Sequence, residues 1–327
     1  MTPAQPEFSI ILPLAEPSLD LALCLDSLAH LQGPEREVLL VLHGPGCEPA
    51  LAQKQAAAAG EAVRVLALAP CPAGAARNFG AQQARGRVLV FSQADCALPA
   101  ELLPRLAAHL ADPALAGAGG ACRPANPDHP LARLAGLEMA FARQAQTDLD
   151  TLCAAYRRAE FLAAGGFDPA DDAEGLENYE FSLRLLALRR ELIFDPELYV
   201  KRPLPEAWNG YLRLAYHLGR NRFRNTLHRR RLGLPSAGGL GQQAQSLLIL
   251  LALGLPFALW PQHPDQALTL PLLCLLLLYP LNRGFLKFVS GEAPELMQRA
   301  LALCLLRPFA ATAGLIRAAL DRMGGGG

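Results

Sequence analysis

Short apolar runs alternate with longer helix-like stretches over the first part of the chain, up to about residue 198. The apolar runs have the length and composition of strands and cover residues 8–14, 37–43, 63–67 and 88–92. The helix-like stretches cover residues 18–31, 50–59, 73–84 and 99–111. Strands separated by helices form βαβ units, in which the strands are parallel and the sheet is covered on both faces. The pattern therefore predicts an α/β domain built around a mainly parallel central sheet.

Ligands of such sheets bind at the carboxyl ends of the strands. The residues that come at or just after the ends of the four runs are Pro13, His43, Pro70 and the turn 92–96. We therefore expect the functional site at this edge of the sheet.

The pattern changes after Trp208. Two very apolar runs, 247–260 and 267–281, are separated only by the segment PQHPDQ. Each is shorter than the roughly 20 residues of a straight membrane span, although flanking residues can extend both. They are either a pair of buried core helices or a membrane hairpin over about residues 243–288.

The distribution of basic residues favours the hairpin. Nine Lys and Arg lie between 201 and 231 against the single acid Glu206, and basic residues recur after the second run at Arg283 and Lys287. The loop between the runs has none, so the positive-inside rule places both ends of the hairpin in the cytoplasm. Residues 296–320 are apolar but interrupted by Arg and Pro, which suits an interfacial helix. We expect a domain at 1–232, on the cytoplasmic side of an inner or cytoplasmic membrane, and a helical membrane region at 233–327.

Composition excludes some classes of protein. The chain has 30 basic and 30 acidic residues, so no overall charge indicates a nucleic-acid partner. Its eight cysteines form no CxxC pair and no Cys/His cluster, which predicts reduced thiols in a cytosol-facing protein. The first residues, with Glu7 and no basic segment, do not begin like a secretory signal.

The most specific segment is PAGAARNFGAQQARGRVLVFSQADC at residues 72–96. It predicts a glycine-bearing loop, a closely packed helix, and a buried strand that brings Asp95 to its carboxyl end. The segment resembles the inverting GT-A glycosyltransferases of family 2, whose pattern is G..ARN.G...A.G, a strand and D-x-D. The resemblance extends from about residue 8 to 224 and includes RRAEFLAAGGFD at 157–168 and ENYEFSLRL at 177–185.

The resemblance implies a nucleotide diphosphate sugar as donor, Mn²⁺ or Mg²⁺ as cofactor, and a lipid-linked or glycan acceptor at membrane lipids. It assigns Asp95 to the metal. It assigns substrate binding to Pro13, Arg77, Asn78, Gln93, Gly165, Gly166, Asn178 and Arg202. Several of these assignments have a structural alternative: Asp95 as a solvated turn residue, Arg77 and Asn78 as a helix start, the two glycines as a helix end, and Arg202 as the start of the basic run beside the membrane.

Several positions depart from the family pattern. Gln93 stands where the family has the first acid of D-x-D, and Leu42 and His43 replace an acidic pair that grips the nucleotide. Asn178 replaces the carboxylate that acts as base, and Arg202 replaces a later histidine. We therefore expect weaker metal binding, with Arg77 or Arg202 sharing the charge of the phosphates.

Two carboxylates remain near the lost base. Glu177 and Glu180 are three residues apart and so share one face of a helix, which makes both candidate catalytic residues. Glu180 alternatively pairs with Arg184. Two functions stay open: an active transferase, or a silent GT-A domain that binds a nucleotide sugar or a partner enzyme. A dehydrogenase is disfavoured, because no G-x-G-x-x-G follows the first strand.

Overall fold

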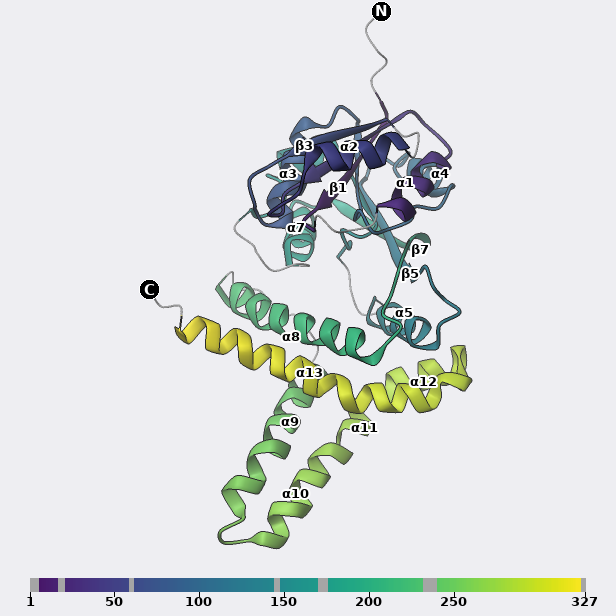
Figure 1. Ribbon diagram of the computed structural model, residues 1–327. Helices are drawn as coiled ribbons and strands as arrows, with labels where there is room; N and C mark the ends of the chain where they lie inside the picture. Colours follow the sequence, from purple (N-terminus) through teal and green to yellow (C-terminus); the bar gives the residue numbers. More distant parts are fainter. Residues whose placement is uncertain are drawn as a thin grey trace, which may run out of the picture. The chain divides into compact units, whose positions relative to one another are not determined.

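The computed structural model describes residues 6–16, 21–58, 62–143, 148–169, 176–231 and 240–324. It divides into two compact units (Figure 1). The first unit comprises Met1–Asn126 and Ala142–Leu204, and the second comprises Pro127–Phe141 and Pro205–Gly327. The basic helix α8 (Trp208–Arg231), which we expected at the end of the first domain, belongs to the second unit.

The first unit contains a seven-stranded sheet in the order β3-β2-β1-β4-β6-β5-β7. The strands are β1 (Phe8–Leu14), β2 (Arg36–Leu42), β3 (Val63–Ala67), β4 (Val88–Phe91), β5 (Leu115–Pro124), β6 (Ala154–Arg157) and β7 (Glu191–Arg202). β1 pairs in parallel with β2 and β4, as does β2 with β3 and β5 with β7. Only β6 runs antiparallel to its neighbours β4 and β5. The predicted α/β fold with a mainly parallel sheet is confirmed.

The sequence pattern located the strands more closely than the helices. β1 and β3 have the predicted bounds, because each coincides with one short, mostly apolar run of the sequence. The helices of this unit are α1 (Ala22–Ala29), α2 (Pro49–Ala58), α3 (Ala73–Gln83), α4 (Leu102–His109), α6 (Arg158–Ala163) and α7 (Leu176–Ala187). The helix expected over 18–31 is shorter, and part of its predicted start lies outside the described residues.

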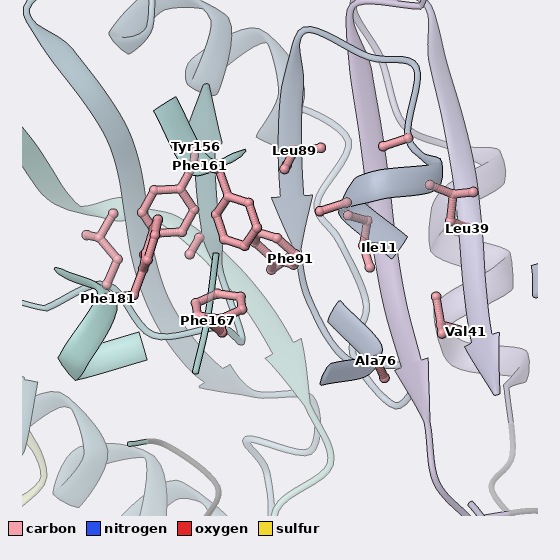
Figure 2. Packing of buried hydrophobic residues seen from close by; sticks show 14 of the residues in the cluster. Ile11, Leu39, Val41, Ala76, Leu89, Phe91, Tyr156, Phe161, Phe167 and Phe181 are labelled. Atoms are coloured by element: carbon pink, nitrogen blue, oxygen red, sulfur yellow. The ribbon is translucent and has the colours of Figure 1, made fainter. Parts of the chain in front are cut away.

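Aromatic side chains fill the core between α3, α6, α7 and the sheet. Phe91, Tyr156, Phe161, Phe167 and Phe181 are all buried, with ring centroids of neighbouring pairs 4.8–6.1 Å apart (Figure 2). Tilted and edge-on aromatic pairs at this separation are attractive beyond their buried area. The cluster therefore fixes α7 and the turn at Phe167 against the strand that leads to Asp95.

Helices account for the elements of the second unit. They are α5 (Pro130–Arg143), α8, α9 (Leu240–Leu259), α10 (Pro264–Leu276), α11 (Leu278–Leu281), α12 (Arg283–Glu292) and α13 (Met297–Gly324), with a short 3-10 turn at Pro294–Leu296. α8 packs closely on α13 because glycines lie at the contact. A Cβ atom added at Gly219 would lie 2.0 Å from the carbonyl oxygen of Ala311, and one at Gly314 would lie 2.0 Å from that of Tyr216.

The α9–α10 hairpin leaves large apolar side chains exposed. Phe257 is 86% exposed, Leu268 65% and Leu276 62%. The two helices lie side by side within the second unit (Figure 1). Buried core helices would have these side chains covered, so their exposure does not fit the alternative of two buried core helices.

Among the described residues, one helical segment is long and apolar enough to cross a membrane by length and composition. It is Pro294–Met323, where an interfacial helix was expected. A second candidate arises if the bent pair Asp265–Leu281 and Arg283–Glu292 counts as one span. The apolar part of α9, Gln243–Leu259, is shorter than a span.

Candidate functional site

The site forms at the carboxyl end of β4. After Phe91 the chain leaves the sheet, and the hydroxyl of the buried Ser92 donates to the carbonyl oxygen of Leu152 at 2.9 Å. Further on, Ala97 forms an isolated antiparallel bridge with Lys201 of β7. Because this bridge ties the turn to the last strand, Arg202 and Asp95 are brought together from positions 107 residues apart.

Asp95 and Arg202 form an ion pair at this edge. The Nε of Arg202 donates to Oδ2 of Asp95 at 2.6 Å, and the Arg202 side chain is 35% exposed and the Asp95 side chain 21%. Within the described part of the chain, this is the one hydrogen bond that the Arg202 guanidinium makes. Its two Nη groups are thus available for a ligand.

The residues at this edge do not fit a tightly held divalent cation. Such ions prefer several oxygen ligands, mostly carboxylates. Gln93 supplies an uncharged amide in place of one carboxylate, and one oxygen of Asp95 already accepts from Arg202. Among the described residues, no group of three or more His, Cys, Asp or Glu side chains is placed to hold a metal. A cation at the other oxygen of Asp95, Oδ1, would lie close to the positive charge of the Arg202 guanidinium.

The arginine of the ARN segment lies in the protein interior. Arg77, on α3, donates from Nη1 to Oε1 of Glu177 on α7 at 2.7 Å, and the side chains are 2% and 3% exposed. Arg77 is therefore not presented to a phosphate, and Glu177 is not presented to an acceptor. The pair instead joins two helices that are separated by 100 residues.

The asparagine of the same segment holds the glycine turn. Asn78 donates from Nδ2 to the carbonyl oxygen of Phe167 at 2.7 Å, and the Phe167 amide donates back to Oδ1 at 2.9 Å. Gly165 and Gly166 have φ of +88° and +67°, a region that glycine adopts without strain. A Cβ at Gly166 would lie 2.6 Å from Asn78 Oδ1, so only glycine allows this approach. The predicted residues Asn78, Gly165 and Gly166 are thus brought together.

Glu180 supports the same turn from α7. It forms an i,i+4 ion pair with Arg184, with Nε donating to Oε1 at 2.9 Å. Arg184 in turn donates from Nη1 to the carbonyl oxygens of Ala164 and Gly166, at 2.6 and 2.7 Å. This is the structural alternative considered for Glu180.

Two carboxylates that the sequence analysis did not single out lie at this edge. Asp148 and Asp150 precede β6, and Ala154 at the start of β6 pairs with Phe91 at the end of β4. The Nδ2 of the buried Asn178 donates to Oδ2 of Asp148 at 3.4 Å. Burial raises the pKa of Asp148, although the Arg143 guanidinium, with Nη1 3.6 Å from Oδ2, acts in the opposite direction. A protonatable carboxyl therefore lies beside the position where the family pattern has its base.

The sequence feature that could have identified these two residues is the segment DLD at 148–150, shortly before the buried strand β6. A parallel strand there would place them at the opposite edge of the sheet. Because β6 is antiparallel, its amino end lies beside the carboxyl end of β4.

The predicted nucleotide side is less polar. Pro13 is buried in β1, and the buried His43 has its Nδ1 2.8 Å from the carbonyl oxygen of Cys71, just before α3. Pro13 therefore offers only backbone groups for recognition, and His43 offers its imidazole.

Comparisons with known proteins identify the fold. Residues 9–159 match the family described as Glycosyl transferase family 2. No curated protein matches the chain. Among solved structures, the chain is similar to the mannosyltransferase PcManGT from Pyrobaculum calidifontis in complex with GDP-Man and Mn²⁺. The TM-score is 0.56 at 18% identity, covering 98% of this chain and 88% of that one.

A second similar structure is TarS 1–349 from S. aureus in complex with UDP-GlcNAc. It has a TM-score of 0.47 and 16% identity, with 98% of this chain and 92% of that one covered. The fold conclusion rests on the first of the two: the sheet and its helices form a GT-A fold.

Proposed function

We propose that the protein transfers a sugar from a nucleotide diphosphate sugar to a lipid-linked or membrane-proximal acceptor, and we take as premise the match of residues 9–159 to glycosyl transferase family 2. The observation that carries the proposal is the partly exposed Asp95–Arg202 pair at the carboxyl edge of the sheet. A departing diphosphate needs positive charge, and this edge is where parallel sheets bind ligands. The GDP-Man in the PcManGT complex supports a donor of this class.

The transfer also needs a base that accepts the proton of the acceptor hydroxyl. The sequence predicted Glu177 or Glu180, but both carboxylates are engaged by arginines in the structure. We propose Asp148 for this role, because it lies next to Asn178 and because burial raises its pKa toward the range of a useful base. A base on the face of the sugar opposite the leaving group would give inversion.

The acceptor side of the proposal rests on the second unit. Exposed apolar side chains on α9 and α10, together with the apolar segment Pro294–Met323, support attachment to a membrane. We propose an inner or cytoplasmic membrane with the transferase domain on its cytoplasmic side, following the distribution of basic residues. A lipid-linked acceptor in the same membrane would then be accessible to the enzyme.

Donor turnover tests the proposal. Detergent-purified full-length protein is incubated with GDP-mannose and with UDP-GlcNAc, and release of the nucleoside diphosphate is measured. We expect release with one donor, and a loss of about 100-fold or more with Asp148→Asn, the usual range for removing a general base. Asp26→Asn, an exposed carboxylate on α1, is the matched control and should leave release unchanged.

The alternative of a silent GT-A domain has its own supporting observation. Asn178 and Gln93 carry amides where the family pattern has carboxylates, and an amide cannot accept a proton near neutral pH. A protein that binds the donor but releases no diphosphate, and gains turnover with Asn178→Asp plus Gln93→Asp, would establish this alternative.

A further inference from the structure

The Arg202 guanidinium lies at the carboxyl edge of the sheet and keeps N–H donors that can bind a diphosphate without a metal. We propose that the Arg202 guanidinium takes the place of the divalent cation, so that this site binds the diphosphate group of its donor in a metal-independent way. The inference rests on the proposed function, because it concerns the donor of that reaction.

The backbone of Arg202 is fixed on both sides. It is the last residue of β7 and pairs with Pro124 of β5, and its carbonyl oxygen accepts from the Ala125 amide at 2.8 Å. Its neighbour Lys201 exchanges two backbone hydrogen bonds with Ala97, at 2.7 and 2.8 Å. A guanidinium that starts from such a strand end is held in place before the ligand arrives, which lowers the cost of ordering it on binding.

The free donors of Arg202 match the chemistry of phosphate oxygens. A guanidinium has five N–H donors, and the one on Nε is bonded to Asp95. The four donors on the Nη groups have no hydrogen-bond partner among the described residues, and the side chain is 35% exposed. Arginine binds phosphate through two parallel hydrogen bonds, which an uncharged or a shorter side chain cannot do.

Positions 93 and 202 both differ in charge from the family pattern. A site with carboxylates at both 93 and 95 would carry two negative charges, which a divalent cation neutralises. Here Gln93 carries none, and Arg202 already neutralises Asp95. Asp150, the nearby carboxylate before β6, uses Oδ1 to accept from the Leu152 amide at 3.0 Å. The site therefore lacks the negative charge that would hold a divalent ion.

Binding of diphosphates with and without metal tests the inference. Full-length protein is titrated calorimetrically with UDP, GDP and inorganic pyrophosphate, once with EDTA and once with Mn²⁺. We expect at least one of these to bind with dissociation constants that agree within about twofold in the two conditions. Arg202→Gln should weaken binding at least about tenfold, and Arg202→Lys by less, because it keeps the charge but loses the paired donors.

Arg123→Gln is the matched control. It removes one positive charge from the neighbouring strand β5, where Arg123 pairs with the exposed Glu197, and should leave binding unchanged. Thermal melting of each variant shows that it is folded.

A reciprocal variant tests the same inference in the other direction. Gln93→Asp plus Arg202→His supplies a second carboxylate and a metal-binding imidazole, and binding should then be at least about tenfold tighter with Mn²⁺ than with EDTA.

The outcomes separate this inference from the proposed function. Wild-type binding that is lost in EDTA, or unchanged affinity in Arg202→Gln, overturns the metal-independent role of Arg202 and leaves the proposed donor class standing. Absence of binding to every diphosphate in both conditions overturns the donor class and the inference with it.

Discussion

At the scale of single residues, the buried Arg77–Glu177 pair has the largest expected effect on stability. Glu177→Ala leaves the Arg77 guanidinium without its partner in a site that is almost closed to water. Breaking a buried pair in this way costs about 3–5 kcal/mol of unfolding free energy. Chemical denaturation measures the loss. Glu197→Ala, which removes an exposed pair with Arg123, should cost less than about 1 kcal/mol. Equal losses in the two variants would contradict a structural role for Glu177.

A second residue-scale prediction concerns pH. Burial raises the pKa of Asp148 above its ordinary value of 3.8, so the native state holds this proton to higher pH than the unfolded chain does. Stability from this group is complete below that ordinary value and is lost as pH rises through the raised one. Asp148→Asn removes the titration. We therefore expect the difference in melting temperature, variant minus parent, to be larger at pH 7 than at pH 4. The opposite trend would show that the ion pair with Arg143 outweighs burial.

The sequence identified residues better than it identified their partners. It assigned substrate binding to Asn78, Gly165 and Gly166, and in the structure Asn78 bonds the backbone of Phe167, directly after the two glycines. It treated Arg77 and Glu177 as separate ligand-facing groups. Their hydrogen bond joins positions 100 residues apart, and the spacing of motifs carries no information on such a distance. The roles predicted for these residues stay predictions.

At the scale of elements, the glycine contact between α8 and α13 is the feature most sensitive to a single methyl group. Gly219→Ala would place a Cβ 2.0 Å from a backbone oxygen of α13, so the two helices would have to separate. We expect a loss of about 1–3 kcal/mol, as for other overpacked contacts. Gly254→Ala on α9 meets nothing within 4 Å and should be neutral or stabilising, because alanine favours a helix. Thermal unfolding in detergent compares the two variants.

Elements were predictable where one signal was sufficient. β1 and β3 each coincide with one short, mostly apolar run, and their bounds were predicted. β6 was not among the predicted strands, and its antiparallel direction depends on pairing with β4 and β5 rather than on its own four residues. That direction places Asp148 at the site, so the missed carboxylate follows from the missed strand.

At the scale of the whole molecule, we expect the full-length chain to sediment with membranes and to resist extraction by alkaline carbonate. Phe257→Lys plus Leu272→Lys places two charges on the exposed apolar surface of the hairpin. Each lysine at the centre of a bilayer costs about 2.5–3.5 kcal/mol on insertion scales. The double variant should move into the soluble fraction. Leu188→Lys, an exposed apolar position in the first unit, should not.

Truncation of the chain after α8 is a poor substitute for these point changes. Truncation near residue 232 would remove α13 and leave the glycine-bearing face of α8 uncovered. A chain that becomes insoluble after such a truncation would therefore report on broken helix packing rather than on membrane attachment.

The hydrogen bonds around the glycine turn have a consequence for how two ligands would bind. Asn78 ties the Phe167 backbone to α3, while Arg184 ties the carbonyl oxygens of Ala164 and Gly166 to α7. A segment held from two helices cannot adjust to one ligand without straining its bonds to the other helix. If the donor contacts α3 and the acceptor contacts the turn, occupancy of one site changes the free energy of binding at the other by an equal amount in both directions. Donor and acceptor would then bind as coupled ligands. Adding the donor without an acceptor should already slow hydrogen exchange at the Phe167 amide, and this change would report the coupling.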